Sequence, residues 1–122
     1  MTSNVLIVED EPNIADALRF ILDHAGFDVA VERDGARVVE TLGRRPFDVM
    51  ILDVMLPNRS GYDVLRDVRA GTQPGLPVLM LTAKGRERDR QTAEDLGVSA
   101  FITKPFSNAE VVQTVRRLAG VA

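Results

Sequence analysis

The chain has 122 residues, 45% of them hydrophobic, which suits one domain that buries a core of its own. The formal net charge of -3 is too mild to favour direct binding of nucleic acid. The absence of cysteine excludes disulfides, thiolate zinc sites and cysteine nucleophiles, and the single histidine disfavours multi-histidine metal sites and serine-histidine triads. No apolar run approaches the roughly 20 residues that span a bilayer, and no basic, cleavable leader precedes the first one, so we expect a cytoplasmic protein without a membrane segment.

The first predicted element is a strand at residues 5–8, where four consecutive apolar residues indicate burial on both faces of a parallel sheet. A helix follows, with Pro12 suited to its first turn and Gly26 to its exit. Its apolar positions recur at helical spacing and are Ile14, Leu18, Ile21, Leu22 and Ala25. Residues 27–32 then alternate apolar and charged side chains, although Ala30 softens the pattern, which predicts an edge strand.

The middle of the chain predicts two more helices and two more buried strands. A second helix follows residues 34–35, and its apolar positions are Val38, Val39 and Leu42. Residues 49–52 and 78–81 repeat the unbroken apolar pattern and predict central strands. Between them, a third helix begins after Ser60, whose predicted capping partner is Asp63. Its apolar positions are Leu65 and Val68.

The fourth predicted helix, residues 84–95, is unusual because it carries four basic and four acidic residues. Little but Ala93 and Leu96 is available to anchor it to a core. We therefore expect it to pack weakly. A brief strand at residues 100–102 is predicted at an edge, and a fifth helix begins after Ser107, with Glu110 completing a capping box. The apolar positions of that helix are Val111, Val115 and Leu118.

Strict alternation of strand and helix with right-handed crossovers predicts one α/β doubly wound domain over residues 1–122. Because the second and fifth strands are the half-polar ones, we expect a parallel five-stranded sheet of order 2-1-3-4-5. The first and third strands are then neighbours at the topological switch point. Sheets of this kind place their sites there, outside the carboxyl ends of the strands.

A set of polar side chains stands at the ends of these strands. Its members are Glu9, Asp10, Asp53, Thr82 and Lys104. Carboxylates ~4 Å apart repel by about 4 kcal/mol per pair at an effective dielectric constant near 20, so a cation is needed among the three acids. An all-oxygen cluster with room for water is what Mg²⁺ prefers, and phosphoryl oxygens commonly complete its coordination. The sequence therefore predicts a Mg²⁺ site that receives a phosphate donor.

Asp53 is the candidate for covalent chemistry at this site. An aspartate can form an acyl phosphate, and the loop at residues 54–60 can leave the outer oxygen of Asp53 open to attack. Lys104 would supply a second cation that stabilises the incoming phosphoryl oxygens, and Thr82 a short hydroxyl donor. We interpret Pro105 as a cis residue that aims Lys104 inward.

Four motifs, V-E-D-E-P, I-L-D-V-M-L-P, L-T-A and I-T-K-P-F, occur in this order, each at a predicted strand end. Together they closely resemble, over essentially the whole chain, the receiver domain of two-component response regulators. The resemblance implies a flavodoxin-like (βα)5 fold in which Asp53 accepts a phosphoryl group from a sensor histidine kinase or a phosphotransfer protein. It implies no turnover enzyme, because such a domain catalyses only its own phosphorylation and dephosphorylation.

The resemblance also implies a metal site and a switch. Mg²⁺, or Mn²⁺ in its place, would be bound directly by Asp10, Asp53 and the backbone carbonyl of Met55, with Glu9 acting mostly through water. On phosphorylation Thr82 would move toward the new phosphoryl oxygens and the aromatic ring of residue 101, a phenylalanine, would rotate inward. The added charge of about two units would shift the face made by the fourth helix, fifth strand and fifth helix, and so control an output protein or a C-terminal effector domain.

The match departs from winged-helix regulators of this family at their dimer contacts. Such regulators pair two acids before the switch aromatic with an arginine of the fifth helix, across a symmetric dimer. Here those positions hold Ser99, Ala100 and Thr114, so the pairing is absent. Arg90 and Glu110 match another cross-dimer pair, but exposed ion pairs contribute only ~0.2–1 kcal/mol each. We therefore do not expect the standard dimer, and a phosphorylation-dependent homodimer of another kind stays open.

Each candidate residue also has an ordinary structural interpretation. The acids after the first strand could cap a helix, Asp53 a loop and Thr82 another helix, and Lys104 could be a surface lysine. Their combination at one sheet edge is what favours a functional site. His24 is interpreted as a surface residue and Phe101 as at least partly a core residue.

Three other functions compete with a signalling module. A Mg²⁺-dependent phosphatase with an aspartyl intermediate would be expected to show D-x-D-x-T after the first strand, where this chain has V-E-D-E-P, and turnover of a phosphate ester without a kinase would reveal it. A pseudo-receiver that only binds proteins would fail to be modified by Mg²⁺ with acetyl phosphate or beryllofluoride. A nucleotide-binding fold is disfavoured, because neither G-x-G-x-x-G nor G-x-x-x-x-G-K-[ST] follows a strand.

Overall fold

The computed structural model describes residues 2–71, 73–83 and 87–120. Within these ranges five parallel strands form one sheet in the order β2-β1-β3-β4-β5, which confirms the predicted order. The strands are β1 (Asn4–Val8), β2 (Asp28–Glu32), β3 (Val49–Asp53), β4 (Val78–Ala83) and β5 (Ala100–Lys104). The adjacent pair β1 and β3 forms the switch point.

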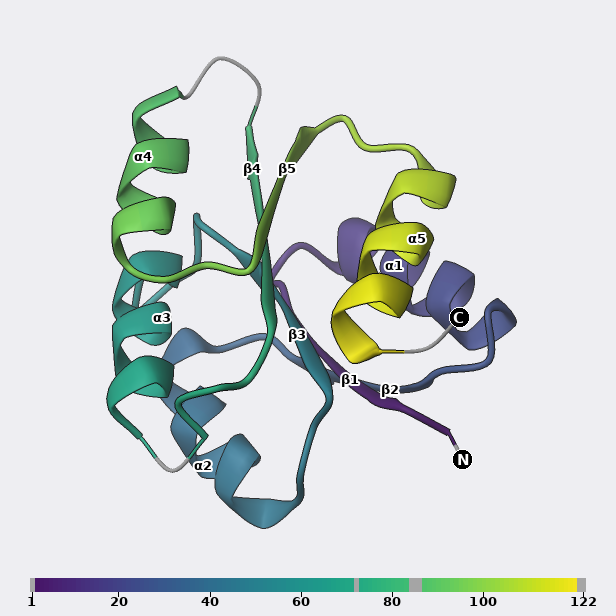
Figure 1. Ribbon diagram of the computed structural model, residues 1–122, viewed down its shortest axis with the longest axis horizontal. Coiled ribbons are helices and arrows are strands. Elements are labelled where there is room, and N and C mark those ends of the chain that lie inside the picture. Colours follow the sequence, from purple (N-terminus) through teal and green to yellow (C-terminus); the bar gives the residue numbers. More distant parts are fainter. Residues whose placement is uncertain (1, 72, 84–86, 121–122) are drawn as a thin grey trace.

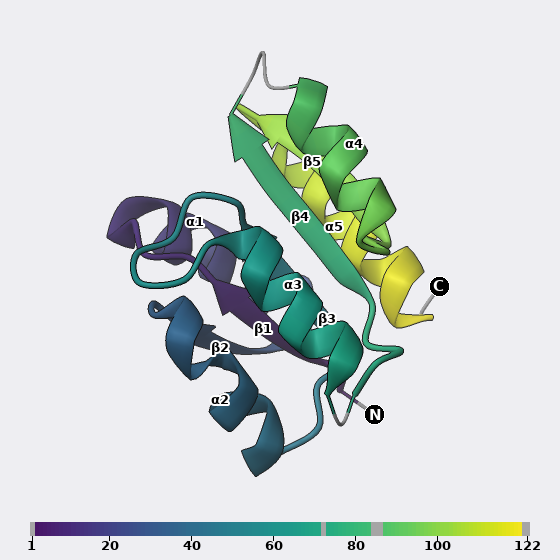
Figure 2. The ribbon, with the colours of Figure 1, turned by 90° about the vertical axis from the view of Figure 1, so that its left-hand side faces the viewer.

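Helices cover both faces of the sheet, so the doubly wound α/β prediction is also confirmed. In the part of the chain that the structure describes, they are α1 (Pro12–His24), α2 (Val38–Arg44), α3 (Gly61–Ala70), α4 (Glu87–Asp95) and α5 (Asn108–Ala119). Figure 1 shows α1 and α5 on one face and α2, α3 and α4 on the other. The view in Figure 2 shows the parallel strands between the two helix layers. None of the described helices is both long and apolar enough to cross a bilayer.

The central strands are buried on both faces, which explains their unbroken apolar sequences. All of β3 is buried, as are residues 5–8 of β1. Toward α2, α3 and α4 the strands contribute Leu6, Met50 and Met80. Toward α1 and α5 they contribute Ile7, Ile51 and Leu79. Successive side chains thus point to opposite cores, as the period of a strand requires.

The helix ends follow the predicted caps. Ser60 and Ser107 each accept a hydrogen bond from the backbone N–H three residues on, at 3.2 and 3.0 Å, and so satisfy an amide that α3 and α5 leave free. Pro12 begins α1, and Gly26 follows its end in the left-handed conformation, with φ 96°.

Several elements differ in extent from the sequence prediction; β4, for example, ends at Ala83 and not at residue 81. A single 3-10 turn, η1 (Gly35–Arg37), precedes α2, and Val39 is 51% exposed, because only residues four apart, Val38 and Leu42, share the buried face of this short helix. Strand β5 runs two residues past the predicted end at residue 102, since Thr103 and Lys104 pair with β4 despite their polarity.

The fourth helix has the sparse anchoring that the sequence predicts. The structure gives α4 as Glu87–Asp95, while the predicted start at residues 84–86 lies outside the described residues. Ala93 is fully buried, and Leu96, just past the helix, is partly buried against the same core.

Candidate functional site

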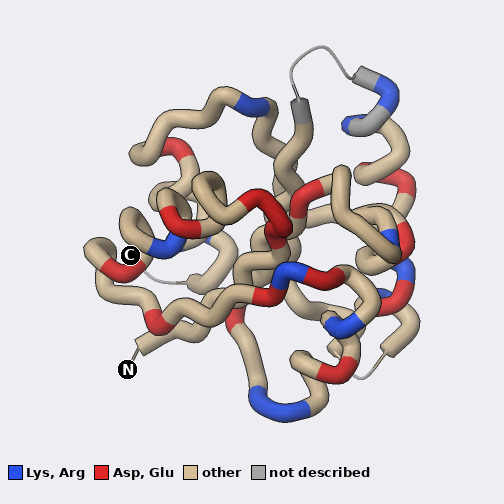
Figure 3. The backbone as a smooth tube through the Cα atoms, turned by 180° about the vertical axis from the view of Figure 1, so that it is seen from behind, with Lys and Arg blue, Asp and Glu red and all other residues tan. Residues whose placement is uncertain are grey.

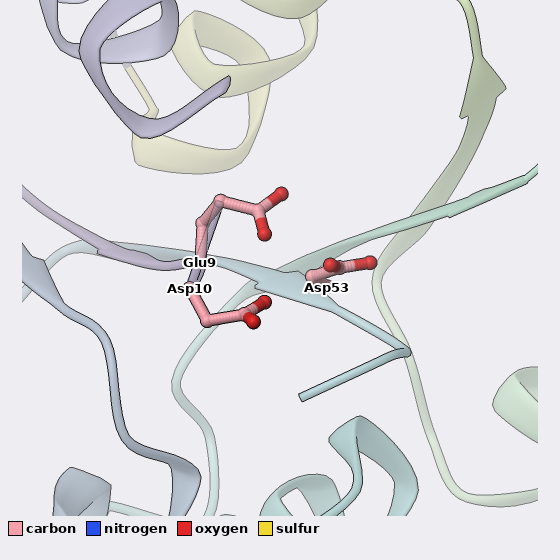
Figure 4. Close-up of side chains that lie close together, drawn as sticks. All are labelled: Glu9, Asp10 and Asp53. Carbon is pink, nitrogen blue, oxygen red and sulfur yellow. The ribbon is translucent and has the colours of Figure 1, made fainter. Parts of the chain in front are cut away.

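Three acidic side chains gather at the carboxyl edge of the sheet. The register pairs Val8 of β1 with Leu52 of β3, so Glu9 and Asp10 lie beside Asp53, the last residue of β3. One oxygen from each of the three carboxylates lies within 4.8 Å of the others. Figure 4 shows the three side chains together at this edge.

The charge of this cluster is only partly balanced by the protein. Glu9 is 1% and Asp53 5% exposed, whereas Asp10 is exposed. The ammonium of Lys104, the last residue of β5, lies 3.3 Å from one oxygen of Glu9 and 3.3 Å from one oxygen of Asp53. Buried carboxylates are costly unless they are paired, and here one ammonium serves two of them beside a third acid. The cluster therefore keeps an excess of negative charge.

The pKa of Glu9 reflects its burial beside Asp53. The pKa is raised from 4.5 to about 7, chiefly by burial and then by a hydrogen bond and repulsion from Asp53, while the Glu11 N–H and Lys104 act in the opposite direction. That N–H donates to a Glu9 oxygen at 3.2 Å. A divalent cation among these oxygens would favour the ionised carboxylate. Oxygen donors, incompletely neutralised charge and the solvent access of Asp10 all fit a hard cation such as Mg²⁺.

The loop after Asp53 approaches the site through its backbone. Met55 lies two residues past Asp53, and its N–H points to an Asp53 oxygen at the long distance of 3.4 Å. The Met55 side chain is 62% exposed. The loop closes where the Gly61 N–H donates to the Val54 carbonyl at 2.9 Å. A Cβ atom at residue 61 would lie 2.8 Å from the Cα of Val54 and closer still to the carbonyl oxygen of Asp53, so this position requires glycine.

The two predicted switch residues lie on neighbouring strands beyond the carboxylates. Thr82 of β4 is 2% exposed and pairs with Thr103 of β5. Phe101 is partly buried, as predicted, and the guanidinium carbon of Arg90 lies 5.2 Å from the centre of its ring. This contact was not predicted from the sequence. An arginine in one element and an aromatic residue in the next are too common in sequences to predict that the two side chains are in contact.

Two smaller predictions, one beside the site and one away from it, are confirmed. The peptide bond between Lys104 and Pro105 is cis. His24 is exposed near the end of α1, with its ring centre 4.8 Å from that of Phe20. The histidine therefore lies at the surface, as the sequence analysis expects.

Further polar residues hold the loop after β3 and were missed from the sequence. Asn58 has a positive φ of 65°, and its side-chain amide donates to Asp34 at 3.2 Å. Arg59 makes two hydrogen bonds with Asp67 of α3, at 2.6 and 2.8 Å. An Asn within a Pro-Asn loop is a recognisable signal of a turn, but nothing local names its distant partner.

Comparison with known proteins agrees with the fold and with the family that the sequence resembles. A family model for the response regulator receiver domain matches residues 5–116. The probable transcriptional regulatory protein TcrX of Mycobacterium tuberculosis is 43% identical over 114 residues, which cover 93% of this chain and 48% of TcrX. The sensory transduction protein RegX3 of Mycobacterium bovis is 41% identical over 116 residues, covering 95% of this chain and 50% of RegX3. The chain thus spans about half the length of these curated relatives.

Solved structures give the same result. A protein assigned as a response regulator from Chloroflexus aurantiacus superposes with a TM-score of 0.95 at 30% identity, covering 98% of this chain and 99% of that one. The receiver domain of the sensor histidine kinase PA1611 from Pseudomonas aeruginosa has a TM-score of 0.90 at 29% identity, with coverage of 98% and 99%, and holds a magnesium ion in its active site cleft. The chain belongs to the response regulator receiver domain family of two-component signalling proteins.

Proposed function

We propose that residues 1–122 act as one receiver domain that accepts a phosphoryl group on Asp53 from a phosphohistidine of a sensor kinase or phosphotransfer protein. The observation that carries this proposal is the buried carboxylate of Asp53 among two acids and the Lys104 ammonium at a sheet edge. An oxygen of Asp53 bonds to phosphorus while the bond from phosphorus to the histidine nitrogen breaks. The electron pair stays on that nitrogen, which is protonated as it leaves.

The residues around Asp53 have different roles in this step. Asp10, Asp53 and the backbone carbonyl of Met55 would hold Mg²⁺, or Mn²⁺ in its place, with Glu9 acting through water. When bound, the metal ion supplies positive charge that offsets the carboxylates and the phosphoryl oxygens. Lys104 can stay within reach of the new phosphoryl oxygens from its position against Asp53. Hydrolysis by water at phosphorus later returns the carboxylate and releases phosphate, so the domain catalyses only its own modification.

The phosphoryl group would act on the rest of the molecule through β4 and β5. Thr82 would approach the added oxygens, and Phe101 would turn inward behind it. The sparsely anchored α4 is the element best suited to shift, and the α4-β5-α5 face would pass the change to an output protein or a C-terminal effector domain. A phosphorylation-dependent homodimer is compatible with this face, but the standard winged-helix dimer is not expected.

We place this exchange in the cytoplasm, with protein partners. Lys and Arg are interspersed with Asp and Glu over the described tube seen in Figure 3. The net charge of the chain is -3. Both features favour protein contacts over direct binding of nucleic acid by this domain.

The test is intact mass after incubation with Mg²⁺ and acetyl phosphate. One phosphoryl group should be added to the wild type and none to Asp53→Asn. Asp48→Asn, a change at an exposed aspartate just before β3, is the matched control and should be labelled like the wild type. Unchanged labelling of Asp53→Asn would contradict the site assignment, and steady release of phosphate from an ester at catalytic rates would favour a phosphatase instead.

A further inference from the structure

The tip of the loop after β3 is tied to a segment far away in the sequence. Asn58 donates its side-chain amide to one oxygen of Asp34, at 3.2 Å. Asp34 belongs to the turn between β2 and α2 and is the N-cap of η1. The same Asp34 oxygen accepts the N–H of Ala36 at 2.9 Å. The carboxylate is thus held in place by its own turn as well as by the hydrogen bond from the loop.

Backbone packing supports this side-chain contact. A Cβ atom on Gly35 would lie 2.5 Å from the carbonyl oxygen of Arg59, so η1 and the loop touch where no larger residue fits. The Ala36 N–H, and after it the Asn58 amide, hold the pKa of Asp34 below its usual 3.8. The carboxylate is therefore charged at neutral pH, and its bonds are of the stronger, charge-assisted kind.

The backbone conformation of Asn58 gives its hydrogen bond to Asp34 a role in shaping the loop. Its φ of 65° lies in the left-handed region, which asparagine tolerates better than other residues with a Cβ. The carbonyl of Met55 precedes Asn58 by three residues in the same short loop. Because the loop is short, a change in the backbone conformation of Asn58 would alter the course of the segment that carries this carbonyl.

We propose that Asp34 and Asn58 are positioning residues of the metal site: their hydrogen bond fixes the loop and thereby the Met55 carbonyl. The inference rests on the proposed function, because it takes this carbonyl as a metal ligand. A metal site requires its donors within about 0.5 Å of the productive geometry, and the groups that orient ligands govern affinity accordingly. Neither residue is among the proposed metal ligands.

The proposal predicts a loss of Mg²⁺ affinity without loss of the fold. Asp34→Ala and Asn58→Gly should each raise the Mg²⁺ dissociation constant about three- to tenfold, less than the ~10- to 100-fold typical of groups bonded directly to a ligand. Asn58→Gly keeps a residue that adopts positive φ, so it removes the side-chain contact without imposing backbone strain. The double variant should be no weaker than either single one, since both remove one interaction.

Isothermal titration calorimetry with MgCl₂ on the purified domain measures these constants, and urea unfolding in EDTA measures stability separately. Asp34→Asn retains an oxygen that can accept both bonds and should keep the affinity within about twofold of the wild type. Asp48→Ala is the matched control, because it removes an exposed aspartate that accepts the Asn4 N–H at 2.7 Å at the other end of the sheet. It should change stability without changing the dissociation constant.

The outcomes separate the inference from the function on which it rests. Wild-type affinity in both Asp34→Ala and Asn58→Gly overturns the inference, while the function stands if Asp53 is still labelled. A wild-type protein that neither binds Mg²⁺ nor is labelled overturns both. If Asp34→Ala fails to fold, Asn58→Gly with Asp34→Asn decides the question: loss in the first with retention in the second supports the proposal, and wild-type affinity in the first overturns it.

Discussion

Gly61 shows how a single residue can set the position of the phosphoacceptor. A methyl group there would meet the backbone of Val54 and Asp53, which cannot swing aside as a side chain could. Gly61→Ala should therefore lower the free energy of unfolding by about 1–3 kcal/mol, as overpacked sites do, and slow the labelling of Asp53. Urea unfolding and intact mass measure the two effects.

The control for Gly61 is a glycine with open space around it. A Cβ on Gly43, in α2, would have no heavy atom within 4 Å. Gly43→Ala should leave labelling unchanged and stabilise the domain by up to about 1 kcal/mol, because alanine favours a helix over glycine. Equal stability of the two variants would contradict the close approach at Gly61.

The pair of Arg59 and Asp67 predicts a dependence on pH. The hydrogen bonds from Arg59 hold the pKa of Asp67 below its usual 3.8. A lowered carboxyl pKa contributes stability that is fully present above the unfolded value and is lost as pH falls through the folded value. Because the pair is partly exposed, Asp67→Asn should cost only about 0.5–1 kcal/mol at pH 7, and the cost should decline as the pH falls below 3.8.

Urea unfolding at several pH values measures this difference, and the Arg59→Ala background provides the control. With its partner removed, Asp67→Asn should have little effect at any pH. A penalty of the same size at pH 7 and at pH ~2.5 would show that Asp67 acts through packing and not through its charge.

At the scale of elements, Arg69 joins α3 to two connections that are distant in the sequence. Its guanidinium donates to the carbonyl of Gly97, just beyond α4, at 3.1 and 2.8 Å, and to those of Leu76 and Pro74, before β4, at 2.7 and 3.0 Å. Burial lowers the pKa of Arg69, but a guanidinium stays charged at neutral pH. The side chain thus anchors the C-terminal end of α4, the element proposed to shift.

Arg69→Ala should lower the free energy of unfolding by about 2–3 kcal/mol, because it removes hydrogen bonds from a charged donor to partly buried carbonyls. Arg69→Lys should recover only part of this, since a compact ammonium cannot reach all three carbonyls at once. Arg66→Ala, which removes an exposed i,i+3 partner of Asp63 on the same helix, should cost no more than ~0.5 kcal/mol. Similar urea midpoints for the Arg66 and Arg69 variants would contradict the anchoring role.

For the whole molecule, the sequence predicts those features that leave a local pattern of apolar and polar residues. Burial on both faces leaves an unbroken apolar run, so the central strands and the strand order could be read, and with them the sheet edge where Glu9, Asp10 and Asp53 meet. Contacts between residues far apart in the sequence could not be predicted, because they form only in the folded chain. Lys104 is polar yet lies within β5 because β4 pairs with it, and Asn58 gives no sign that Asp34 is its partner.

The same separation of the site residues along the chain predicts that Mg²⁺ stabilises the fold. The acids after β1 and at the end of β3 are brought together only by folding, so the unfolded chain offers no comparable site. Above its dissociation constant, each tenfold rise in Mg²⁺ should add about 1.4 kcal/mol to the free energy of unfolding. Asp10→Asn should flatten this dependence, whereas Asp16→Asn, at an exposed position of α1, should retain it. Urea unfolding across MgCl₂ concentrations, with NaCl balancing ionic strength, measures the slope. An equal gain with NaCl alone would assign the effect to charge screening of the acidic surface and not to a bound ion.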